Sequence, residues 1–528
     1  VQENSYHTKL PRKNHTTMNL NTTAAKISAP DITFSPDLQR EAKEVYVIGR
    51  KAGLTQQNFV SVTSAENDEK IIGALLNSIK ESGKATTFLT DERKLTVIAL
   101  PAEDKISRNN HTFSPHEITD SLDGLHSSAR ENLVQICVID QEIEKFMCPV
   151  AAAIARAMPL YHSKSSLKEL APTSGVNVTF YSNNADEVPT HPSAEKEYET
   201  ASAVCNGVRL AAQLGDMPPA ELSPDTYAQK CQEIANGFAA QGVTYTEIKG
   251  DDLRQKGYGG IMGVGMAARC PPRMVIMTYS PADATEHIAL CGKGVVYDTG
   301  GLALKSKVGM CGMKHDCGGS AGVLGGFVSA VRLGLPVKLT LILAIVENAI
   351  GPESFRNDDI LTMKSGKTVE VNNTDAEGRL ILADCVSHAS NQLGDVDLIV
   401  NMATLTGAQC ITTGSCHAGI MTRTKALEDR VVEAGLMSGD LTFPMLYAPE
   451  LLKKKFKSSV ADMKNSVANR MNAQASCAGH FIESHIDEAY KGDWCHVDMA
   501  GPDSRNDGRA TGYGVALVLG LCKAPGFC

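Results

Sequence analysis

The sequence lacks the features of several common protein classes. Its apolar runs are too short for a membrane-spanning helix. It has no Cys-x-x-Cys pair and no His-Glu-x-x-His motif, which excludes the common zinc fingers and one large class of metalloprotease. It also lacks an excess of positive charge: the net charge is −9, which argues against a broad nucleic-acid-binding surface. We therefore expect neither a membrane nor a nucleic acid as a partner.

Cysteine is present but shows no pairing pattern. The 15 cysteines are an odd number and are scattered from Cys137 to Cys528. A disulfide framework would show clustered cysteines in a short chain. Scattered thiols in a long chain are typical of a reducing compartment, where cysteine behaves as a small buried hydrophobe. We therefore expect a cytoplasmic protein.

The length of 528 residues exceeds that of one ordinary domain. The first residues are polar and nearly free of acidic side chains, which predicts a flexible tail over 1–35. A polar stretch with prolines, Asn183–Glu197, is typical of a linker. We therefore predict an N-terminal domain over 36–185 and a larger domain over 186–528, which holds every chemically specific motif.

Short β-branched segments alternate with amphipathic segments in both predicted domains. The predicted strands are Val45–Ile48, Leu95–Leu100, Val134–Ile139 and Val176–Tyr181 in the first domain, and Met274–Tyr279, His287–Cys291, Leu339–Val346, Leu398–Met402 and Cys495–Met499 in the second. The predicted helices include Asp68–Ser82, Tyr198–Leu214, Ala321–Leu333, Leu380–Leu393, Ala426–Leu436, Ala473–Ile486 and Gly512–Cys522. This alternation predicts the α/β class for both domains, with a central mixed sheet covered by helices in the larger one.

Two segments of the larger domain combine charged residues with glycines at predicted strand ends. The first runs from Gly292 to Lys305 and continues to Asp316, and the second is Asn373–Leu380. Open α/β sheets place their sites at the carboxyl ends of strands. Ionised groups there are costly to desolvate unless they are paired or bind a metal. Four carboxylates with two or three cations predict a carboxylate-bridged metal site rather than an ordinary network of salt bridges.

The octapeptide Asn373–Leu380 resembles the signature of the leucyl aminopeptidase, or cytosol aminopeptidase, family. Gly292–Lys305 is similar to the first metal-binding segment of that family, and the resemblance spans about Tyr198–Cys522. Tyr297 and Thr299 are closest to its "probable aminopeptidase" branch. The resemblance implies a metal-dependent aminopeptidase that hydrolyses the N-terminal residue from peptides with a water activated by two metal ions.

The same resemblance implies which residues form the site. The implied metal ligands are Lys293, Asp298, Asp316, Asp375 and Glu377, and Asp298 and Glu377 bridge the two ions. Zinc is the first choice, with manganese, magnesium or cobalt as alternatives, because oxygen ligands with one amine accept all four. A lysine ligates only as a neutral amine, so the implied pKa of Lys293 is strongly lowered.

Two further residues are implied to be catalytic without binding the metal. Lys305 would polarise the scissile carbonyl, and Arg379 would hold a bicarbonate ion that serves as general base. Family members form hexamers, so the resemblance also implies a homohexamer.

Four other residues resemble the wall of the pocket for the substrate's first side chain. They are Met313, Thr404, Leu405 and Gly407. An adaptable, apolar methionine favours Leu-like or Met-like side chains in the substrate, although packing in the core is an equally good interpretation of Met313.

Two alternative functions stay open at this point. Gly318-Gly-Ser-Ala-Gly322 matches the nucleophile-elbow pattern of serine hydrolases, with Ser320 as nucleophile, but no hydrophobic strand precedes it. Small residues that let a helix pack closely beneath a site are the favoured interpretation. The other alternative is a non-enzymatic scaffold or nucleic-acid-binding protein on the same fold. The complete ligand set, with Lys305 and Arg379, argues against it.

Overall fold

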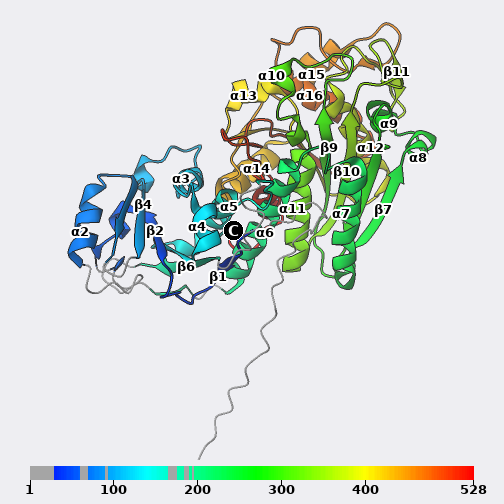
Figure 1. Cartoon of the computed structure of the whole chain (residues 1–528). Coiled ribbons are helices and arrows are strands. Elements are labelled where there is room, and N and C mark those ends of the chain that lie inside the picture. The colour runs from blue at the N-terminus through cyan, green and yellow to red at the C-terminus, as the bar shows by residue number, and fades with distance from the viewer. Residues whose placement is uncertain are drawn as a thin grey trace, which may run out of the picture.

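The computed structural model describes residues 29–56, 58–59, 69–89, 93–164, 175–183, 190–192 and 195–527. The chain forms a smaller lobe from its N-terminal part and a larger lobe from the rest (Figure 1). Of the expected tail, residues 1–28 lie outside this description, and Ile32–Phe34 form strand β1. Most of the predicted linker Asn183–Glu197 also lies outside it, and helix α6 begins at Glu195.

The smaller lobe contains a six-stranded sheet. Across the sheet the order is β1 (Ile32–Phe34), β6 (Val176–Ser182), β5 (Val134–Asp140), β2 (Glu44–Arg50), β4 (Lys94–Leu100) and β3 (Gly83–Phe88). Only β3 is antiparallel to its neighbour. Helices α3 (Pro115–Ser121), α4 (Leu125–Glu131) and α5 (Ile143–Ala157) cover one face, and α2 (Glu69–Ser78) covers the other. The central strands are apolar along their length because both faces are covered.

The larger lobe is built on an eight-stranded mixed sheet. Its order is β15 (Thr442–Pro444), β14 (Ala418–Thr422), β17 (Asp493–Asp498), β13 (Leu398–Ala403), β9 (His287–Asp298), β10 (Lys338–Asn348), β8 (Arg273–Tyr279) and β7 (Thr244–Lys249). Strands β13, β9 and β10 at its centre are parallel. A small sheet of β11 (Ile360–Thr362), β12 (Thr368–Glu370) and β16 (Met463–Lys464) lies beside it.

Helices cover both faces of the larger sheet, and each face has its own apolar core. One face packs against α6 (Glu195–Asp216), α7 (Pro224–Gly237), α11 (Gly318–Leu333), α14 (Lys425–Ser438) and α17 (Val515–Leu521). The other packs against α8 (Asp251–Gln255), α9 (Gly259–Gly265), α12 (Glu377–Gln392) and α16 (Gln474–Glu483). The shorter helices are α10 (Lys307–Met310), α13 (Gly407–Thr413) and α15 (Pro449–Leu452).

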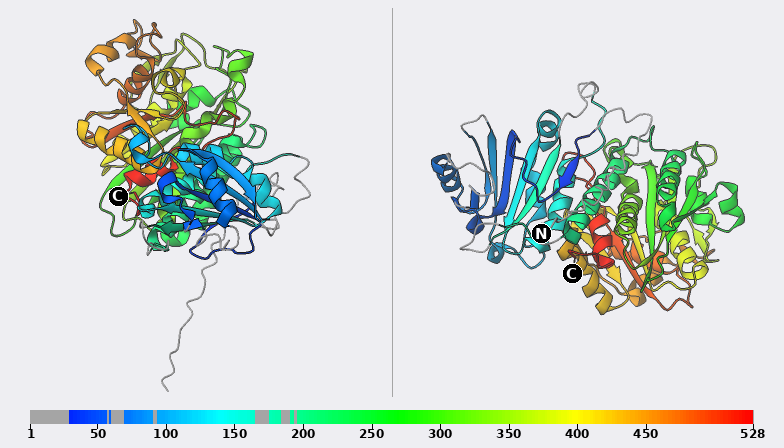
Figure 2. Two further views of the ribbon diagram at one scale, coloured as in Figure 1. Left: turned by 90° about the vertical axis from the view of Figure 1, so that its left-hand side faces the viewer. Right: turned by 90° about the horizontal axis from the view of Figure 1, so that it is seen from below.

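Buried arginines join the two lobes, which lie side by side when seen from below (Figure 2). Arg209 on α6 donates hydrogen bonds to the carbonyl oxygens of Met158 (2.9 Å) and Pro30 (2.8 Å). Arg156 at the end of α5 forms an ion pair with Asp440 of the larger lobe. Charged groups this deeply buried stay stable only when paired, so these contacts constrain the orientation of the lobes.

The structure confirms the predicted α/β class and the predicted strands. The strands that were not predicted are β1, β3, β7, β14, β15 and the three strands of the small sheet. Strands β3 and β7 alternate exposed and more buried positions and lack a continuous apolar run. Among the described residues, no helix has the length and apolarity that crossing a membrane requires.

The three central parallel strands end at the same edge of the larger sheet. Strand β9 ends at Asp298, β10 at Asn348 and β13 at Ala403. Helices α10, α13 and α16 lie at this end of the lobe (Figure 1). The chain therefore directs the segments after these strands to one place.

Candidate metal and catalytic site

The predicted ligands come from three segments that meet at this edge. Lys293 and Asp298 belong to β9, and Asp316 lies in the 3-10 helix η6 (Met313–Cys317). Asp375 directly precedes α12, and Glu377 is the first residue of that helix. One oxygen from each of Asp298, Asp375 and Glu377 lies within 4.8 Å of the other two. The structure therefore brings together side chains that are far apart in the sequence.

The Lys293 amine is surrounded by oxygen atoms. Its Nζ lies 2.6 Å from Asp316 Oδ1, 3.0 Å from Glu377 Oε1 and 2.9 Å from the carbonyl oxygen of Thr404. An added Cβ at Gly378 would lie 2.6 Å from Lys293 Cε, so only glycine leaves room for this lysine. This explains why a glycine follows Glu377 at the start of α12.

Lys305 contacts the other side of the carboxylate cluster. Its Nζ lies 2.8 Å from Asp298 Oδ2 and 2.5 Å from Asp375 Oδ1. Burial alone would lower the pKa of Lys305, but these two carboxylates raise it above its usual value. Lys305 is therefore positively charged at neutral pH when only these protein groups surround it.

Asp298 is held in place by a residue that the sequence analysis did not assign to the site. Asn348, at the end of β10, donates from Nδ2 to Asp298 Oδ1 (2.8 Å) and to the carbonyl oxygen of Thr374 (3.1 Å). The backbone N–H of Gly300 also donates to Asp298 Oδ1 (2.8 Å). Asn348 thus ties the first carboxylate segment to the second one.

The electrostatics of the cluster fit bound dications. Burial raises the pKa of Asp316 and of Glu377, and neighbouring carboxylates add to the effect. Asp316 Oδ2 and Glu377 Oε2 are buried and have no hydrogen-bond partner in the described part of the chain. Several carboxylates crowded together with free buried oxygens are the donor set that hard divalent ions prefer.

The pKa of Lys293 is shifted in the direction opposite to the shift implied for a metal ligand. Burial lowers it, but Asp316, Glu377 and Asp298 together raise it above its usual value. Two adjacent dications would oppose these carboxylates and favour the neutral amine. Ligation by Lys293 would therefore depend on the charge of the ions themselves.

Arg379 is the third residue of α12 and is almost completely buried. Burial lowers its pKa to about 10. Its Nη1 donates to the carbonyl oxygen of Asn465 (3.0 Å), while its Nε has no partner within the described ranges. A buried guanidinium with an unused donor is suited to binding an anion.

Asn465 is the second residue that sequence reasoning missed, and it organises the loop before α12. Its Oδ1 accepts from the backbone N–H groups of Asn372 (2.8 Å) and Asn373 (3.2 Å), and its Nδ2 donates to the carbonyl oxygen of Asn373 (2.6 Å). Its own carbonyl binds Arg379. It lies within the stretch Tyr198–Cys522 that resembles the family, but no local pattern shows this distant contact.

The four residues predicted to line the substrate pocket lie beside the cluster along the chain. Thr404 donates from Oγ1 to Asp316 Oδ1 (2.8 Å), so it contacts a predicted ligand directly. Met313 is the first residue of η6, Leu405 is half-buried and Gly407 begins α13. Among these, only Thr404 has a polar contact with the carboxylates in the described structure.

The loop that holds Thr404 and Leu405 is fixed by a buried carboxylate. Asp498, at the end of β17, accepts from the backbone N–H of Leu405 (3.0 Å) and from Thr406 Oγ1 (2.7 Å). Burial raises the pKa of Asp498 to about 6, although these hydrogen bonds favour its charged form. The loop is therefore anchored to the same sheet that carries the ligands.

Ser320 does not have the environment of a nucleophile. It is completely buried in the first turn of α11, where its Oγ contacts the Tyr227 hydroxyl (2.8 Å) and donates to the carbonyl oxygen of Cys317 (2.7 Å). An added Cβ at Gly319 would lie 2.2 Å from the carbonyl oxygen of Met402. The glycines here serve the close packing of α11 against β13, as favoured from the sequence.

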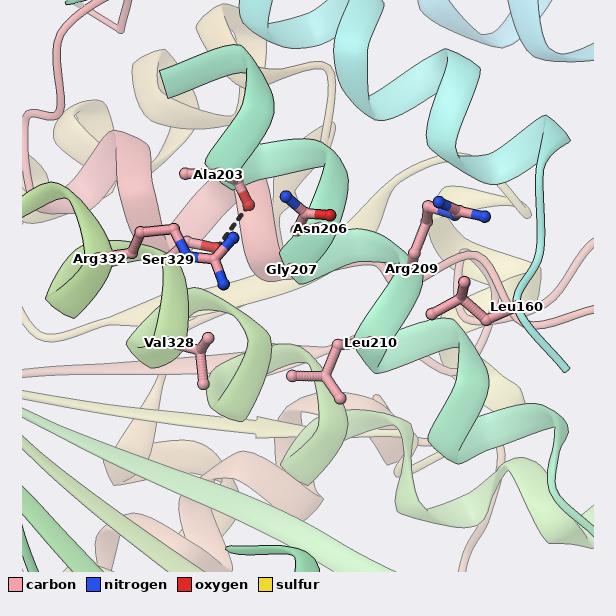
Figure 3. A pocket seen from close by; sticks show the side chains of 9 residues that line it. All are labelled: Leu160, Ala203, Asn206, Gly207, Arg209, Leu210, Val328, Ser329 and Arg332. Carbon is pink, nitrogen blue, oxygen red and sulfur yellow. Dashed lines mark hydrogen bonds between the residues drawn. The ribbon is translucent and has the colours of Figure 1, made fainter. Parts of the chain in front are cut away.

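A small cavity between α6 and α11 is unrelated to the cluster (Figure 3). It is lined by Leu160, Arg209, Ser329, Arg332 and neighbouring residues, and it contains none of the predicted ligands. Its volume of about 20 Å³ holds a single water molecule at most. This cavity therefore plays no part in the predicted site.

The larger lobe has a mixed sheet covered by helices, with a lysine–carboxylate cluster at the strand ends. These two features define the class of protein. Residues 209–519 match the catalytic domain of the cytosol aminopeptidase family, and the chain belongs to this family. The family predicted from the octapeptide is thereby confirmed.

The chain is similar to several individual members of this family. It is 45% identical to "Probable aminopeptidase NPEPL1" of Mus musculus over 427 residues, which are 81% of this chain and 79% of the relative. It is 41% identical to "Leucine aminopeptidase 1" of Caenorhabditis elegans, over 79% of this chain and 82% of that one. The structure of leucyl aminopeptidase from Trypanosoma cruzi superposes with a TM-score of 0.84 at 35% identity, covering 95% of this chain and 98% of that one. The resemblance to the "probable aminopeptidase" branch is confirmed.

Proposed function

We propose that this chain is a metal-dependent aminopeptidase that removes the N-terminal residue from peptides. The observation that carries the proposal is the convergence of Asp298, Asp375 and Glu377 next to Lys293. When bound, two divalent ions would lower the pKa of a water and polarise a carbonyl group. The names of the solved relatives, which are leucyl aminopeptidases, support the same reaction class.

Five residues would hold the ions: Lys293, Asp298, Asp316, Asp375 and Glu377. Asp298 and Glu377 would be shared between both ions, which agrees with their central position in the cluster. Zinc is our first choice, and manganese, magnesium and cobalt are compatible with the same oxygen and amine donors.

Lys305 and Arg379 would act directly on the substrate and on the proton. The ammonium group of Lys305 would bind the oxygen of the scissile carbonyl and stabilise the negative charge that develops there. The guanidinium of Arg379 would hold a bicarbonate ion, whose oxygen would accept a proton from the attacking water. The unused Nε donor of Arg379 supports a role in anion binding.

The finer properties of the protein are also part of the proposal. Met313, Thr404, Leu405 and Gly407 would line the pocket for the substrate's first side chain, with a preference for Leu-like or Met-like residues. We propose a homohexamer, and a cytoplasmic location is supported by the name "Probable cytosol aminopeptidase" of bacterial relatives. Large apolar side chains exposed near the site, such as Val308 (84%) and Ile411 (90%), support contact with other subunits.

The proposed function is tested with a panel of aminoacyl-amidomethylcoumarin substrates. The protein is stripped of metal and then reloaded with zinc, manganese or cobalt. We expect release of the fluorophore from Leu and Met substrates with at least one of these ions. Absence of turnover with every ion and every substrate would refute the aminopeptidase assignment.

Removal of the metal separates this function from the serine-hydrolase alternative. A chelator is expected to abolish turnover, because the water and the carbonyl would lose their activation. Ser320→Ala is expected to retain the wild-type rate of hydrolysis within about threefold. Its buried hydroxyl takes no part in metal-dependent hydrolysis. The serine-hydrolase function would be favoured instead by two results together. The wild type would resist the chelator, and a normally folded Ser320→Ala protein would have lost its activity.

Asn465→Asp is expected to weaken metal binding although the residue is not a ligand. The variant exchanges the Nδ2 donor for a carboxylate oxygen facing the carbonyl oxygen of Asn373, which disturbs the loop before Glu377. Residues that orient ligands typically change metal affinity by about 10–100-fold. Calorimetric titration of the stripped protein measures this affinity. Asn391→Asp, exposed at the C-terminal end of α12 and away from Glu377 at its start, is the matched control, and equal affinities in the two variants would contradict the role of Asn465.

A further inference from the structure

The segment Pro449–Met471 carries a charge opposite to that of the whole chain. It contains six basic residues and two acidic ones, whereas the complete sequence has a net charge of −9. Four of the basic residues fall within Lys453–Lys457. This concentration of one sign creates a local positive potential on an otherwise acidic protein.

Four of these basic side chains have no acidic partner among the described residues. Lys453 is paired with Glu483 (3.1 Å) and Lys464 with Glu370 (3.2 Å). The others are Lys454, Lys455, Lys457 and Arg470, which we call the basic rim; all four are exposed, and none forms an ion pair in the described part of the chain. Their charge is therefore available to a binding partner.

The basic rim is held rigidly by the residues between its members. Phe456 is buried and packs against Phe481 of α16, with ring centroids 5.7 Å apart. Met463–Lys464 form strand β16, which pairs with β12. Charges fixed on an ordered segment lose less conformational entropy on binding than charges on a flexible tail.

The same segment borders the catalytic site. Asn465 lies within it and contacts both the loop before Glu377 and Arg379. Arg470 belongs to the same segment and follows Asn465 by five positions. Helix α15, which begins the segment, and helix α16, which follows it, lie at the site end of the larger lobe (Figure 1).

We propose that the basic rim selects peptides that carry a carboxylate downstream of the scissile bond. The inference rests on the proposed aminopeptidase function and adds a substrate class to it. The substrate's N-terminal residue would be at the carboxylate cluster, so the rest of the peptide must leave across the surroundings of the site. A carboxylate on that part of the peptide would be attracted by Arg470 and Lys455, which raises its association rate.

A peptide fits the basic rim better than a nucleic acid does. Nucleic acids carry closely spaced charges and need an extended basic surface to bind. Four rim residues on a chain of net charge −9 provide only a local attraction. This suits one or two carboxylates held close to the site.

The test compares two amidated peptides, Leu-Gly-Asp-Gly-NH2 and Leu-Gly-Asn-Gly-NH2, on the metal-loaded enzyme. We expect kcat/KM to be about fivefold higher for the Asp peptide in about 20 mM salt and the ratio to fall below about twofold in 0.5 M salt, because salt screens exposed charges. Equal values for the two peptides at low salt would overturn this inference while leaving the aminopeptidase function intact. Failure to cleave either peptide would refute both.

Charge-reversal variants locate the effect. Lys455→Glu and Arg470→Glu are each expected to reduce the Asp-to-Asn ratio to about one or below. Lys491→Glu, an exposed lysine just before β17 at the opposite end of that strand from Asp498, changes the net charge equally and is expected to keep the wild-type ratio. An equal loss of preference in all three variants would contradict the basic rim and assign the effect to overall charge.

Discussion

Glu377→Gln is expected to reduce kcat/KM by about 10³-fold or more and to abolish tight binding of at least one metal ion. Glutamine has the same shape but no charge, so it is a weaker ligand for a dication. It would also remove one of the carboxylates that contact the Lys293 amine, because Lys293 Nζ lies 3.0 Å from Glu377 Oε1. Metal content after dialysis and turnover of a Leu substrate measure the two effects.

Asp384→Asn is the matched control, because Asp384 is a buried carboxylate on the same helix. It accepts hydrogen bonds from the backbone N–H groups of Ile261 (2.9 Å) and Lys364 (2.8 Å) and has no contact with the predicted ligands. Burial raises its pKa to about 7, so loss of the charge is a small change at that position, and the amide donor that replaces one accepting oxygen is expected to lower stability rather than metal content. We expect this variant to keep its metal. If Glu377→Gln binds two ions as tightly as Asp384→Asn does, Glu377 is not a ligand.

The carboxylate cluster could be predicted from the sequence because its ligands lie in short, dense segments at strand ends. Asp298 ends β9, and Asp375 and Glu377 surround the start of α12, so the local pattern already contains both the chemistry and its position. Five potential ligands within two such segments are rarely explained by surface salt bridges.

The supporting residues could not be predicted in the same way. Asn465 contacts Asn372 from 93 positions further along the chain, and Asn348 reaches Asp298 from a neighbouring strand. Asparagine is common in loops, and its hydrogen bonds here depend on the assembled fold rather than on its sequence neighbours. Edge strands such as β3 were missed for a related reason, because their pairing stabilises them more than their own residues do.

Lys305 is a different case: the structure shows its contacts, but these contacts do not show its proposed catalytic role. Its ammonium group now lies against Asp298 Oδ2 and Asp375 Oδ1, two oxygens of the same carboxylates that would bind an ion. A cation that competes for these oxygens opposes metal binding, whereas a cation that stabilises the reacting carbonyl assists catalysis. Activity alone cannot separate the two roles, but metal affinity can.

Lys305→Met is therefore expected to lower kcat by about 10²–10³-fold while binding metal at least as tightly as the wild type. Methionine keeps most of the side-chain volume and removes the charge, so the competition for Asp298 and Asp375 disappears. The measurements are single-substrate kinetics on a Leu substrate and calorimetric titration of the stripped protein. A fall in metal affinity would make Lys305 part of the metal site, and a rate within about threefold of the wild type would exclude it from catalysis. Both variants are expected to turn over slowly, but Lys305→Met keeps its metal whereas Glu377→Gln loses it, so metal binding distinguishes a residue that acts on the substrate from one that holds the ions.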